Sequence, residues 1–357
     1  MANPTWHNIH PDFWLNGVQH TKESLFELGH ALVKSEEPYK KPIGEFLRDW
    51  ISQKPTVAVD TSGSTGNPKT IVLKKEHMMN SALATGAYFQ LGANQNALLC
   101  LPCTGIAGKM MLVRAMVLGL HLDYVEPSSN PLSGNTKTYD FVAMVPLQVQ
   151  NSLDQMDRVK QLIIGGAPVD LFLRSKLHSL SVQAFETYGM TETITHIAVK
   201  RINDESTDYF ETLPNVSIAV DDRGCLIIDA PQISDEKIIT NDLVELIGKH
   251  QFEWLGRYDS IINSGGIKLV PEKIEEKFSS LIQSRFFVAG LPDEALGQKL
   301  VLVVEGGMLD QHELIQNIKG LKEVSKYEVP KAVYFVKAFE ETSTKKVDRK
   351  KTLQQIS

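Results

Sequence analysis

Long apolar segments are missing from this sequence. The longest, MMLVRAMVLGL at residues 110–120, is interrupted by Arg114 and is too short to cross a bilayer, so we expect no membrane span. The first residues, MANPTWHNIHPDF, lack the basic segment and apolar run that mark a signal peptide. We therefore expect a cytoplasmic protein.

Cysteine is scarce as well. The three cysteines, Cys100, Cys103 and Cys225, cannot form a disulfide framework, and an odd number suits a reducing compartment. Cys100 and Cys103 have the C-x-x-C spacing that occurs in redox sites. The surrounding ALLCLPCTG favours instead a buried strand that leaves a sheet, with both thiols packed in the core.

The sequence also lacks a strong excess of either charge. Of its 357 residues 22% are charged, and the formal net charge is −6, which gives no general attraction for nucleic acid or for an anionic membrane. No repeat or low-complexity segment appears. The length and the 42% of hydrophobic residues suit an ordinary globular chain of two or three domains.

The distribution of apolar runs predicts an α/β fold. Residues 21–52 have the pattern of two amphipathic helices, and short apolar runs then alternate with helical patterns, which is typical of a largely parallel sheet. Residues 196–229 favour antiparallel strands, and the chain from Tyr258 onward favours a compact α+β unit. We expect a large N-terminal nucleotide- and acid-binding domain, residues 1–258, and a small mobile C-terminal domain, residues 259–357.

One loop is unusually rich in hydroxyls and glycines. It reads TSGSTGNPK, from Thr61 to Lys69, between the strand-like TVAVD and TIVLK. Successive exposed N–H groups in such a loop form an anion-binding nest, to which Lys69 adds a positive charge. It is not a Walker motif, because Pro68 precedes the lysine. Taken alone, it is either a phosphate-binding loop or a serine-rich surface turn.

Five further stretches have a similar polarity. IIGGAPV at 163–169 has the small residues that let a flat ring lie against bare backbone, and ETYGMTET at 186–193 supplies an aromatic ring and a hard oxygen ligand suited to Mg²⁺. IITNDLVEL is followed by WLGRYDSIINSGGIKL, and TSTKKVDRK lies almost at the C-terminus. Each of these alone is more typical of a turn, a surface ion pair or a solvated basic tail.

In this order and spacing, the stretches resemble those of the adenylate-forming superfamily, which includes acyl- and aryl-CoA ligases, peptide-synthetase adenylation domains and luciferases. The resemblance covers about residues 56–350, and TSGSTGNPK together with YGMTE is specific. It implies an enzyme in which a carboxylate attacks the α-phosphate of ATP to give an acyl-AMP and pyrophosphate. A thiol, usually that of coenzyme A, then displaces AMP. The implied ligands are ATP, Mg²⁺, coenzyme A and a small carboxylic acid; no oligomeric state is implied.

The resemblance also implies roles for residues of this chain. Catalysis would use Thr191, Glu192 and Lys346, with Glu192 as the metal ligand, and Asp259 would be the hinge between domains. The acid would contact Thr104, Gly105, Lys109, Thr195 and His196. The nucleotide would be held by hydroxyls, glycines, an aromatic ring and charged groups from every stretch except TSTKKVDRK: Thr61, Ser62, Gly63, Ser64, Thr65, Gly66, Lys69, Gly166, Ala167, Pro168, Tyr188, Gly189, Met190, Asp242, Arg257, Gly265 and Gly266.

Three departures from the superfamily pattern matter. The common Thr-Gly-Asp is Thr240-Asn241-Asp242, which keeps the acid, and the glycine before the catalytic lysine is Lys345. We assign the role to Lys346, because VDR then stays in register. The usual LP-aromatic-x-His stretch, whose ring lines the acyl pocket, is replaced by LPCTGIAGK, so we expect an unusual acyl pocket.

Within the superfamily, LPCTGIAGKMMLVRA, VPLQVQ and YGMTETITHIA look most like a short o-succinylbenzoate–CoA ligase of menaquinone biosynthesis. That acid has a second, non-reacting carboxylate, for which Lys109 at the start of a helix is the predicted partner. Alternatives are a CoA ligase for another aryl or acyl acid, and a non-catalytic nucleotide-binding homologue.

Overall fold

The computed structural model describes residues 5–61, 69–203, 206–307, 310–341 and 347–356. By the contacts among its residues, the chain divides into two compact units. The first comprises Met1–Ile218, Ile228–Ile238 and Ile247–Gln251, and the second comprises Ala219–Ile227, Ile239–Leu246 and Phe252–Ser357. The expected division between residues 258 and 259 stays a prediction.

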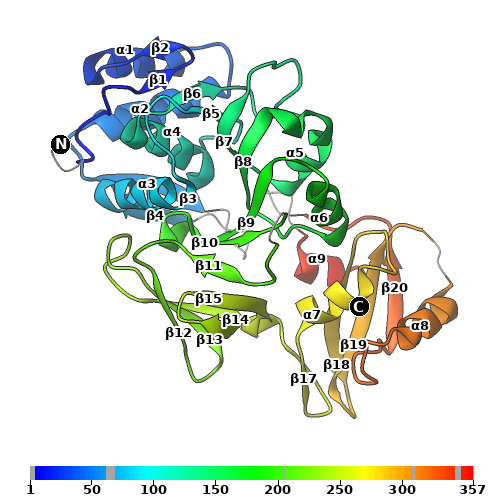
Figure 1. Ribbon diagram of the computed structural model, residues 1–357. Helices are drawn as coiled ribbons and strands as arrows, with labels where there is room; N and C mark the ends of the chain where they lie inside the picture. The colour runs from blue at the N-terminus through cyan, green and yellow to red at the C-terminus, as the bar shows by residue number, and fades with distance from the viewer. Residues whose placement is uncertain (1–4, 62–68, 204–205, 308–309, 342–346, 357) are drawn as a thin grey trace. The chain divides into compact units, whose positions relative to one another are not determined.

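The first unit contains a sheet with the order β11-β10-β9-β8-β7-β5-β6-β1-β2 (Figure 1). Pairing is parallel from β9 to β1 and antiparallel at both edges. This confirms the expected α/β fold with an added antiparallel part. The strands are β1 (Trp14–Leu15), β2 (Val18–Gln19), β5 (Asn96–Leu99), β6 (His121–Tyr124), β7 (Tyr139–Met144), β8 (Val159–Ile164), β9 (Gln183–Gly189), β10 (His196–Arg201) and β11 (Phe210–Thr212).

Helices connect these strands, as the alternating pattern predicts. They are α1 (Lys22–Val33), α2 (Lys40–Ile51), α3 (Lys75–Phe89), α4 (Ile106–Leu118), α5 (Pro146–Asn151) and α6 (Leu171–His178), with short 3-10 helices η1 (Leu153–Arg158) and η2 (Thr191–Thr193). The helices α1 and α2 pack closely, because a Cβ on Gly44 would lie 2.5 Å from the carbonyl oxygen of Gly29. The helix α4 starts three residues before the expected Lys109 and ends at Gly119, which has a φ of +76°.

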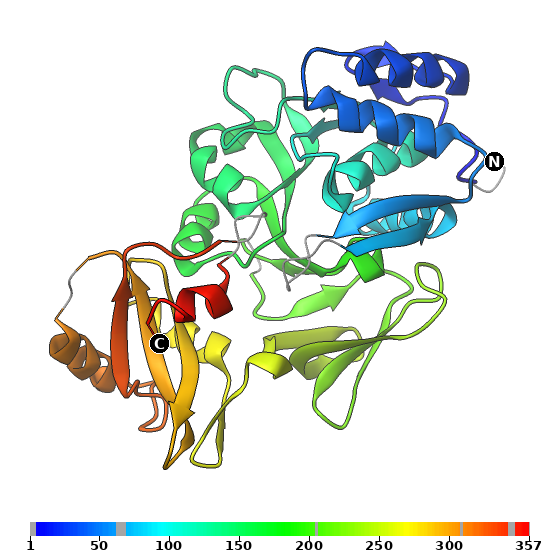
Figure 2. The same ribbon diagram turned by 180° about the vertical axis from the view of Figure 1, so that it is seen from behind.

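The strands on either side of the hydroxyl-rich loop pair only with each other in the described part of the chain. The strands β3 (Thr56–Thr61) and β4 (Lys69–Lys74) form an antiparallel two-stranded sheet beside α3, as Figures 1 and 2 show. The sequence pattern placed them in the main α/β succession. The seven residues between them are too few for a parallel crossover, which needs a dozen or more.

Four strands that the sequence pattern only partly indicated contribute residues to the second unit. The strands β12 (Ser217–Val220), β13 (Cys225–Asp229), β14 (Ile238–Gly248) and β15 (Gln251–Arg257) follow one another in the sheet. After η3 (Tyr258–Ser260) come β16 (Ile262–Ser264), β17 (Ile267–Leu269), α7 (Pro271–Phe278), β18 (Phe286–Asp293), β19 (Gly297–Glu305), α8 (Gln311–Gly320), β20 (Ala332–Val336) and α9 (Arg349–Leu353). The strands β16 to β20 form a sheet of their own, with the order β17-β16-β19-β18 and β20 beside β19.

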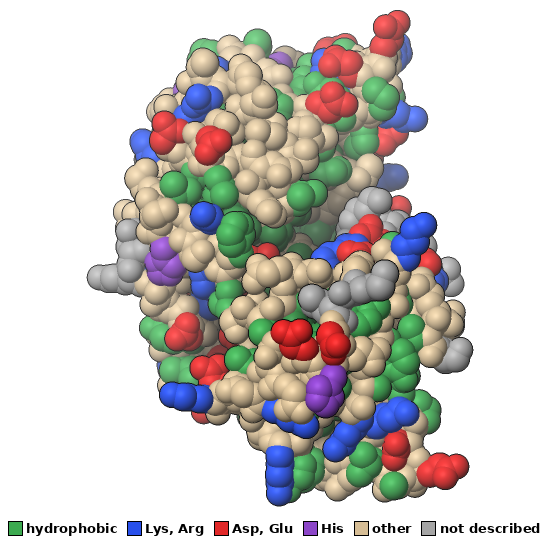
Figure 3. Space-filling model, turned by 90° about the vertical axis from the view of Figure 1, so that its right-hand side faces the viewer, with side chains coloured by type: hydrophobic (Ala, Val, Ile, Leu, Met, Phe, Trp, Pro, Cys, Tyr) green, Lys and Arg blue, Asp and Glu red, His purple; other side chains and the backbone are tan. Residues whose placement is uncertain are grey.

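The surface that Figure 3 shows has acidic and basic side chains interspersed rather than gathered by sign. None of the helices in the described ranges has the length and apolar character needed to cross a membrane. The buried side chains of β7, β8 and β9 form one apolar cluster of the first unit, which includes Val142, Leu162 and Ala184. This core fixes the carboxyl ends of the parallel strands β8 and β9, where the predicted base-binding residues of this unit lie.

Candidate nucleotide- and acid-binding site

The predicted phosphate loop is closed by a strand pair. Thr61 and Lys69, the last residue of β3 and the first of β4, lie opposite each other in the antiparallel register. The next pair in this register is Asp60 and Thr70, and the Thr70 hydroxyl donates to the Asp60 carboxylate at 2.6 Å. Ser62, Gly63, Ser64, Thr65 and Gly66 lie outside the described residues, so their role stays a prediction.

The predicted base-binding loop follows β8. Gly166, Ala167 and Pro168 are exposed, and Gly166 has a φ of +84°, in the left-handed region that favours glycine. A Cβ on Gly165 would lie 2.6 Å from Oγ1 of Thr187, whose hydroxyl donates to the Ile164 carbonyl at 3.0 Å. Small residues are therefore required here by the packing of β8 on β9.

Tyr188 lies at the same edge of the sheet as this loop. The strands β8 and β9 are parallel, with Ile164 opposite Glu186, so the segments that follow them emerge side by side. The ring of Tyr188 contacts that of Phe210, with centroids 5.8 Å apart. At Gly189 a Cβ would lie 2.3 Å from the carbonyl oxygen of Thr195, so only glycine fits. The structure thus brings together the small-residue loop and the aromatic ring that the sequence predicted on two separate stretches.

Thr191 and Glu192 lie in η2, directly after Tyr188-Gly189-Met190. The turn is held by Thr193, a fully buried residue that the sequence interpretation missed. Its Oγ1 accepts the N–H of Met190 at 2.9 Å, and its hydroxyl lies 2.7 Å from the Thr195 carbonyl oxygen. The short spacing of three threonines in TETIT was the signal that a buried anchor was present.

Glu192 suits a role as a metal ligand. Its side chain is exposed, and it has no hydrogen bond or ion pair with another residue in the described ranges. Those ranges contain no cluster of three metal-binding side chains. Mg²⁺ usually keeps several waters and takes one or two carboxylates plus substrate phosphates, so a single exposed carboxylate fits it.

The predicted ribose ligand, Asp242, belongs to the second unit. It is buried on β14, where it accepts a hydrogen bond from Trp254 Nε1 at 3.2 Å and lies 3.7 Å from Nη1 of Arg257. Arg257 also donates from Nε and Nη2 to the two carboxylate oxygens of Asp259, at 2.9 and 3.1 Å. These hydrogen bonds lower the pKa of Asp259. The predicted hinge residue is therefore tied to one of the predicted nucleotide ligands.

Gly265 and Gly266 form the turn between β16 and β17. Their φ angles are +59° and +82°, as in the type I′ turns that join twisted strands. Lys345 and Lys346 lie outside the described residues. The chain on either side of them is held by a bridge between Glu341 and Val347.

Lys109, the predicted partner of the acid, lies in the first turn of α4. Its ammonium donates to the carbonyl oxygens of Cys103 and Thr104, at 2.6 and 3.0 Å, just ahead of Gly105. Burial lowers its pKa. Two of its three N–H groups thus hold the loop that precedes its own helix, and one is left for a ligand.

A second cation on the same helix was missed by the sequence interpretation. Arg114 is 1% exposed, and it contacts Oγ1 of Thr85 at 3.4 Å and Nδ1 of His196 at 3.4 Å. It forms no ion pair with a carboxylate in the described part of the chain, and burial lowers its pKa to about 9, which still leaves it charged at neutral pH. An arginine in the middle of MMLVRAMVLGL was the available signal. We call Arg114, Thr85 and His196 the Arg114 cluster.

His196, which the sequence predicted as a substrate contact, is neutral in this cluster. Burial, and then the charge of Arg114, hold its pKa well below the usual value. Arginine is only a donor, so Nδ1 of His196 is the acceptor and the ring proton is on Nε2. That buried Nε2 has no hydrogen-bond partner among the described residues.

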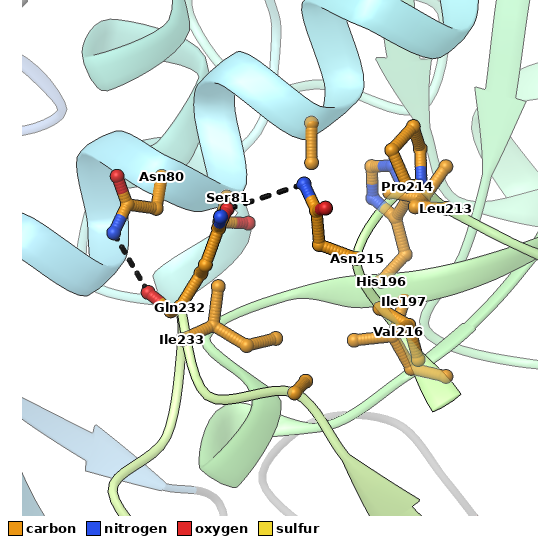
Figure 4. Close-up of a pocket in the computed structure, with 12 residues that line it drawn as sticks. Asn80, Ser81, His196, Ile197, Leu213, Pro214, Asn215, Val216, Gln232 and Ile233 are labelled. Carbon is orange, nitrogen blue, oxygen red and sulfur yellow. Dashed lines mark hydrogen bonds between the residues drawn. The ribbon is translucent and has the colours of Figure 1, made fainter. Parts of the chain in front are cut away.

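His196 also lines a small pocket between α3, β10 and two loops (Figure 4). Its volume of about 10 Å³ has room for roughly one water molecule. Gln232 closes one side, because its carbonyl accepts from Asn80 at 2.8 Å and its side chain accepts from Asn215 at 3.3 Å. His196 therefore contributes to the wall of the pocket, and Thr195 is the residue before His196 in the chain.

Cys100 and Cys103 are buried thiols at the end of β5. Burial raises the pKa of each to about 12, and Sγ of Cys100 lies 3.4 Å from the Ala143 carbonyl oxygen. Redox catalysis needs an accessible thiol of low pKa. The two residues act here as core packing.

Comparison with known proteins shows which family and which solved structures this chain resembles. The profile of a family described as AMP-binding enzyme matches residues 52–232. A 2-succinylbenzoate–CoA ligase of Bacillus cytotoxicus is 23% identical over 82% of this chain and 69% of its own length. An acyl-CoA synthetase (AMP-forming)/AMP-acid ligase II-like protein from Dyadobacter fermentans is 40% identical, with a TM-score of 0.62, over 93% of this chain and 98% of its own. O-succinylbenzoate coenzyme A synthetase from Bacillus subtilis, in complex with ATP and a magnesium ion, has the same fold, with a TM-score of 0.75 at 18% identity over 95% and 83% of the two chains.

The matched segment runs from the end of α2 to the loop that closes the small pocket, so it includes the phosphate loop, the base-binding loop, η2 and the Arg114 cluster. It covers half of the chain, and the Dyadobacter protein resembles nearly all of it. The chain belongs to the AMP-binding enzyme family of adenylate-forming acid–thiol ligases.

Proposed function

We propose that this protein is an ATP-dependent acid–CoA ligase that forms an acyl-AMP intermediate and acts on o-succinylbenzoate. Family membership supports the adenylating chemistry. The observation that supports a dicarboxylic acid is Arg114, a buried cation without a carboxylate partner in the described ranges. A buried charge is costly unless it is paired, so an anion supplied by the substrate is the natural partner of this guanidinium.

The nucleotide would lie at the carboxyl edge of the parallel strands. The loop at 166–168 and Tyr188 would enclose the adenine, and the N–H groups of the hydroxyl-rich loop would bind the phosphates. Asp242 would accept the ribose hydroxyls with Arg257 beside it. Glu192 would hold Mg²⁺, which neutralises charge on the phosphates when it is bound.

Lys346 would stabilise the charge that develops on the α-phosphate as pyrophosphate leaves. Asp259 would act as a hinge that exchanges this lysine for a surface bordered by Gly265 and Gly266, past which the thiol of coenzyme A would approach. The second carboxylate of the acid would be bound by Arg114, with Lys109 as the alternative that the sequence predicted. A cytoplasmic location and a role in menaquinone biosynthesis are part of the same proposal.

The test is acid-dependent release of pyrophosphate from ATP, with a panel of acids. The panel would contain o-succinylbenzoate, its analogue without the second carboxylate, benzoate and medium-chain fatty acids. We expect the highest kcat/KM for o-succinylbenzoate and formation of its CoA thioester when coenzyme A is added. A preference for benzoate or a fatty acid would replace the substrate but keep the reaction. No acid-dependent release with any member would favour the non-catalytic homologue.

A further inference from the structure

Glu186 is a buried carboxylate at the nucleotide edge that has no role in the reaction proposed above. It lies in β9, opposite Ile164 of β8 on one side and Lys200 of β10 on the other, and it is 7% exposed. A carboxylate is rarely buried without a specific set of partners. Those partners show what it does.

The carboxylate of Glu186 binds three groups from three different elements. Its Oε2 lies 2.8 Å from Nη2 of Arg174 on α6 and 3.0 Å from Nζ of Lys200 on β10. Its Oε1 accepts the backbone N–H of Val169 at 3.1 Å, in a buried hydrogen bond. One negative charge therefore stands between two cations and also fixes a point on the main chain.

This main-chain hydrogen bond holds one end of the base-binding loop. The other end is held by the N–H of Gly165, which donates to the Met144 carbonyl at 3.1 Å. Between these two anchors only Gly166, Ala167 and Pro168 are left, and all three are exposed. The position of the exposed part of the loop is thus set by Glu186 at its C-terminal end.

The Glu186 carboxylate also contacts Tyr188 indirectly, through Lys200 and Phe210. Lys200, which Glu186 holds, has its ammonium 4.8 Å from the centroid of the Phe210 ring. The Phe210 ring contacts Tyr188, with centroids 5.8 Å apart. A cation over a ring and two rings in contact are each attractive, so movement of Lys200 would be transmitted to Tyr188.

We infer that Glu186 is a positioning residue for the base of the nucleotide: it sets the separation between the loop at 166–168 and the Tyr188 ring, and so selects a flat purine. The inference rests on the proposed function for the presence of a nucleotide there. Glu186 does not touch the base; it acts through Val169 on one side and through Lys200 and Phe210 on the other. A slot of fixed width is preorganised for binding, so the base does not have to order the loop.

The test is the variant Glu186→Gln. The amide oxygen can still accept the Val169 N–H, but the charge is lost and an NH₂ group now faces Arg174 and Lys200, which are themselves donors. Because a hydrogen bond to a charged group is worth more than a neutral one, we expect the Kd for AMP, measured by calorimetry, to rise about tenfold. The KM for ATP should rise by a similar factor, and the preference for ATP over GTP should fall. The KM for the acid should stay within about twofold, since the two sites are separate.

A matched control is available at the opposite end of the same sheet. Asp140, in β7, also binds one lysine and one backbone N–H: Lys160 at 2.6 Å and Asn96 at 2.8 Å. Asp140→Asn should lower the melting temperature of the protein without changing the Kd for AMP. If both variants weaken AMP binding in proportion to their loss of stability, Glu186 is merely structural and the inference is wrong.

A second variant keeps the test informative if Glu186→Gln fails to fold. Arg174→Gln removes one cation whose side chain is 19% exposed, and Glu186 keeps both Lys200 and the Val169 N–H. It should raise the Kd for AMP by about threefold, and less in the Glu186→Gln background, because contacts within one network are not additive. Unchanged AMP binding in both variants, with normal binding by the wild type, would overturn the inference alone. A wild type that binds neither ATP nor AMP would overturn the proposed function instead.

Discussion

The nucleotide edge and the Arg114 cluster are built in opposite ways, although both lie in the first unit. At the nucleotide edge the exposed atoms belong to short loops, and the charges behind them are matched, with Glu186 between Arg174 and Lys200. In the Arg114 cluster the cation itself is buried, and the neighbouring His196 has a buried nitrogen without a partner in the described ranges. The first arrangement is satisfied without a ligand, whereas in the proposed function the substrate supplies the anion that pairs with the second.

This difference gives a way to assign residues to one region or the other. A substitution at the nucleotide end should affect every acid by the same factor, because all acids share ATP. A substitution in the Arg114 cluster should affect acids according to their second carboxylate. The predictions below use this criterion.

The largest effect is expected at Lys346. Lys346→Ala should slow the formation of acyl-AMP by about 10²- to 10³-fold, the usual loss for one preorganised group that stabilises transition-state charge. The loss should be equal for o-succinylbenzoate and for its analogue without the second carboxylate. Thioester formation from ready-made acyl-AMP should stay near the wild-type rate. Single-turnover kinetics with the acyl-AMP of each acid would measure this.

Lys345 is the internal control for this assignment. Lys345→Ala should leave both half-reactions close to the wild type, because the register of VDR places Lys346 at the catalytic position. The reverse result, a large loss in Lys345→Ala and little in Lys346→Ala, would show that the register is wrong by one residue.

The second largest effect is expected at Arg114. Arg114→Met fills a similar volume without a charge, so kcat/KM for o-succinylbenzoate should fall about ten- to a hundredfold, while the analogue should be almost unaffected. The same variant should be more stable than the wild type by about 1 kcal/mol or more in urea unfolding, because an unpaired buried charge is removed. Equal losses with both acids, or a loss of stability, would contradict the role proposed for this residue.

These expectations also show how far the sequence could predict the site. The order of elements and the segments near the nucleotide were predictable, because they depend on local patterns: Gly166 has a positive φ, and Gly189 faces a carbonyl that leaves no room for a Cβ. The strands β14 and β15 were only partly indicated, since their exposed residues interrupt the apolar pattern. Arg114 was visible in the sequence, but its partners Thr85 and His196 come from α3 and β10, and only the packing of the chain brings them together.

Lys109 should show a smaller effect that does not depend on the acid. It donates to the carbonyls of Cys103 and Thr104, so Lys109→Ala should loosen the loop before α4 and lower kcat/KM by about three- to tenfold for both acids alike. A double variant with Arg114→Met should be nearly additive if the two cations act separately. A loss confined to the dicarboxylate would favour Lys109 over Arg114 as its partner, as the sequence predicted.

The smallest effect is expected in the pH dependence of stability, through His196. Its pKa is well below 6.5 in the folded protein, by burial and then by the charge of Arg114. Below pH 6.5 the unfolded chain therefore takes up a proton at this residue and the folded protein does not. Stability falls as the pH decreases from about 6.5 toward the folded pKa, by at most about 1.4 kcal/mol per pH unit from this group.

Urea unfolding of the wild type and of His196→Gln at pH 7.5 and 5.5 isolates this contribution. The other histidines are present in both proteins, so their contributions cancel in the difference, and the variant should lose less stability on acidification, by up to about 1.4 kcal/mol. Arg114→Met should reduce the loss by a smaller amount, because it removes the charge but not the burial. If His196→Gln loses as much stability as the wild type, the histidine is not held neutral by the cluster. The contrast drawn above between the Arg114 cluster and the nucleotide edge would then lose one of its two supports.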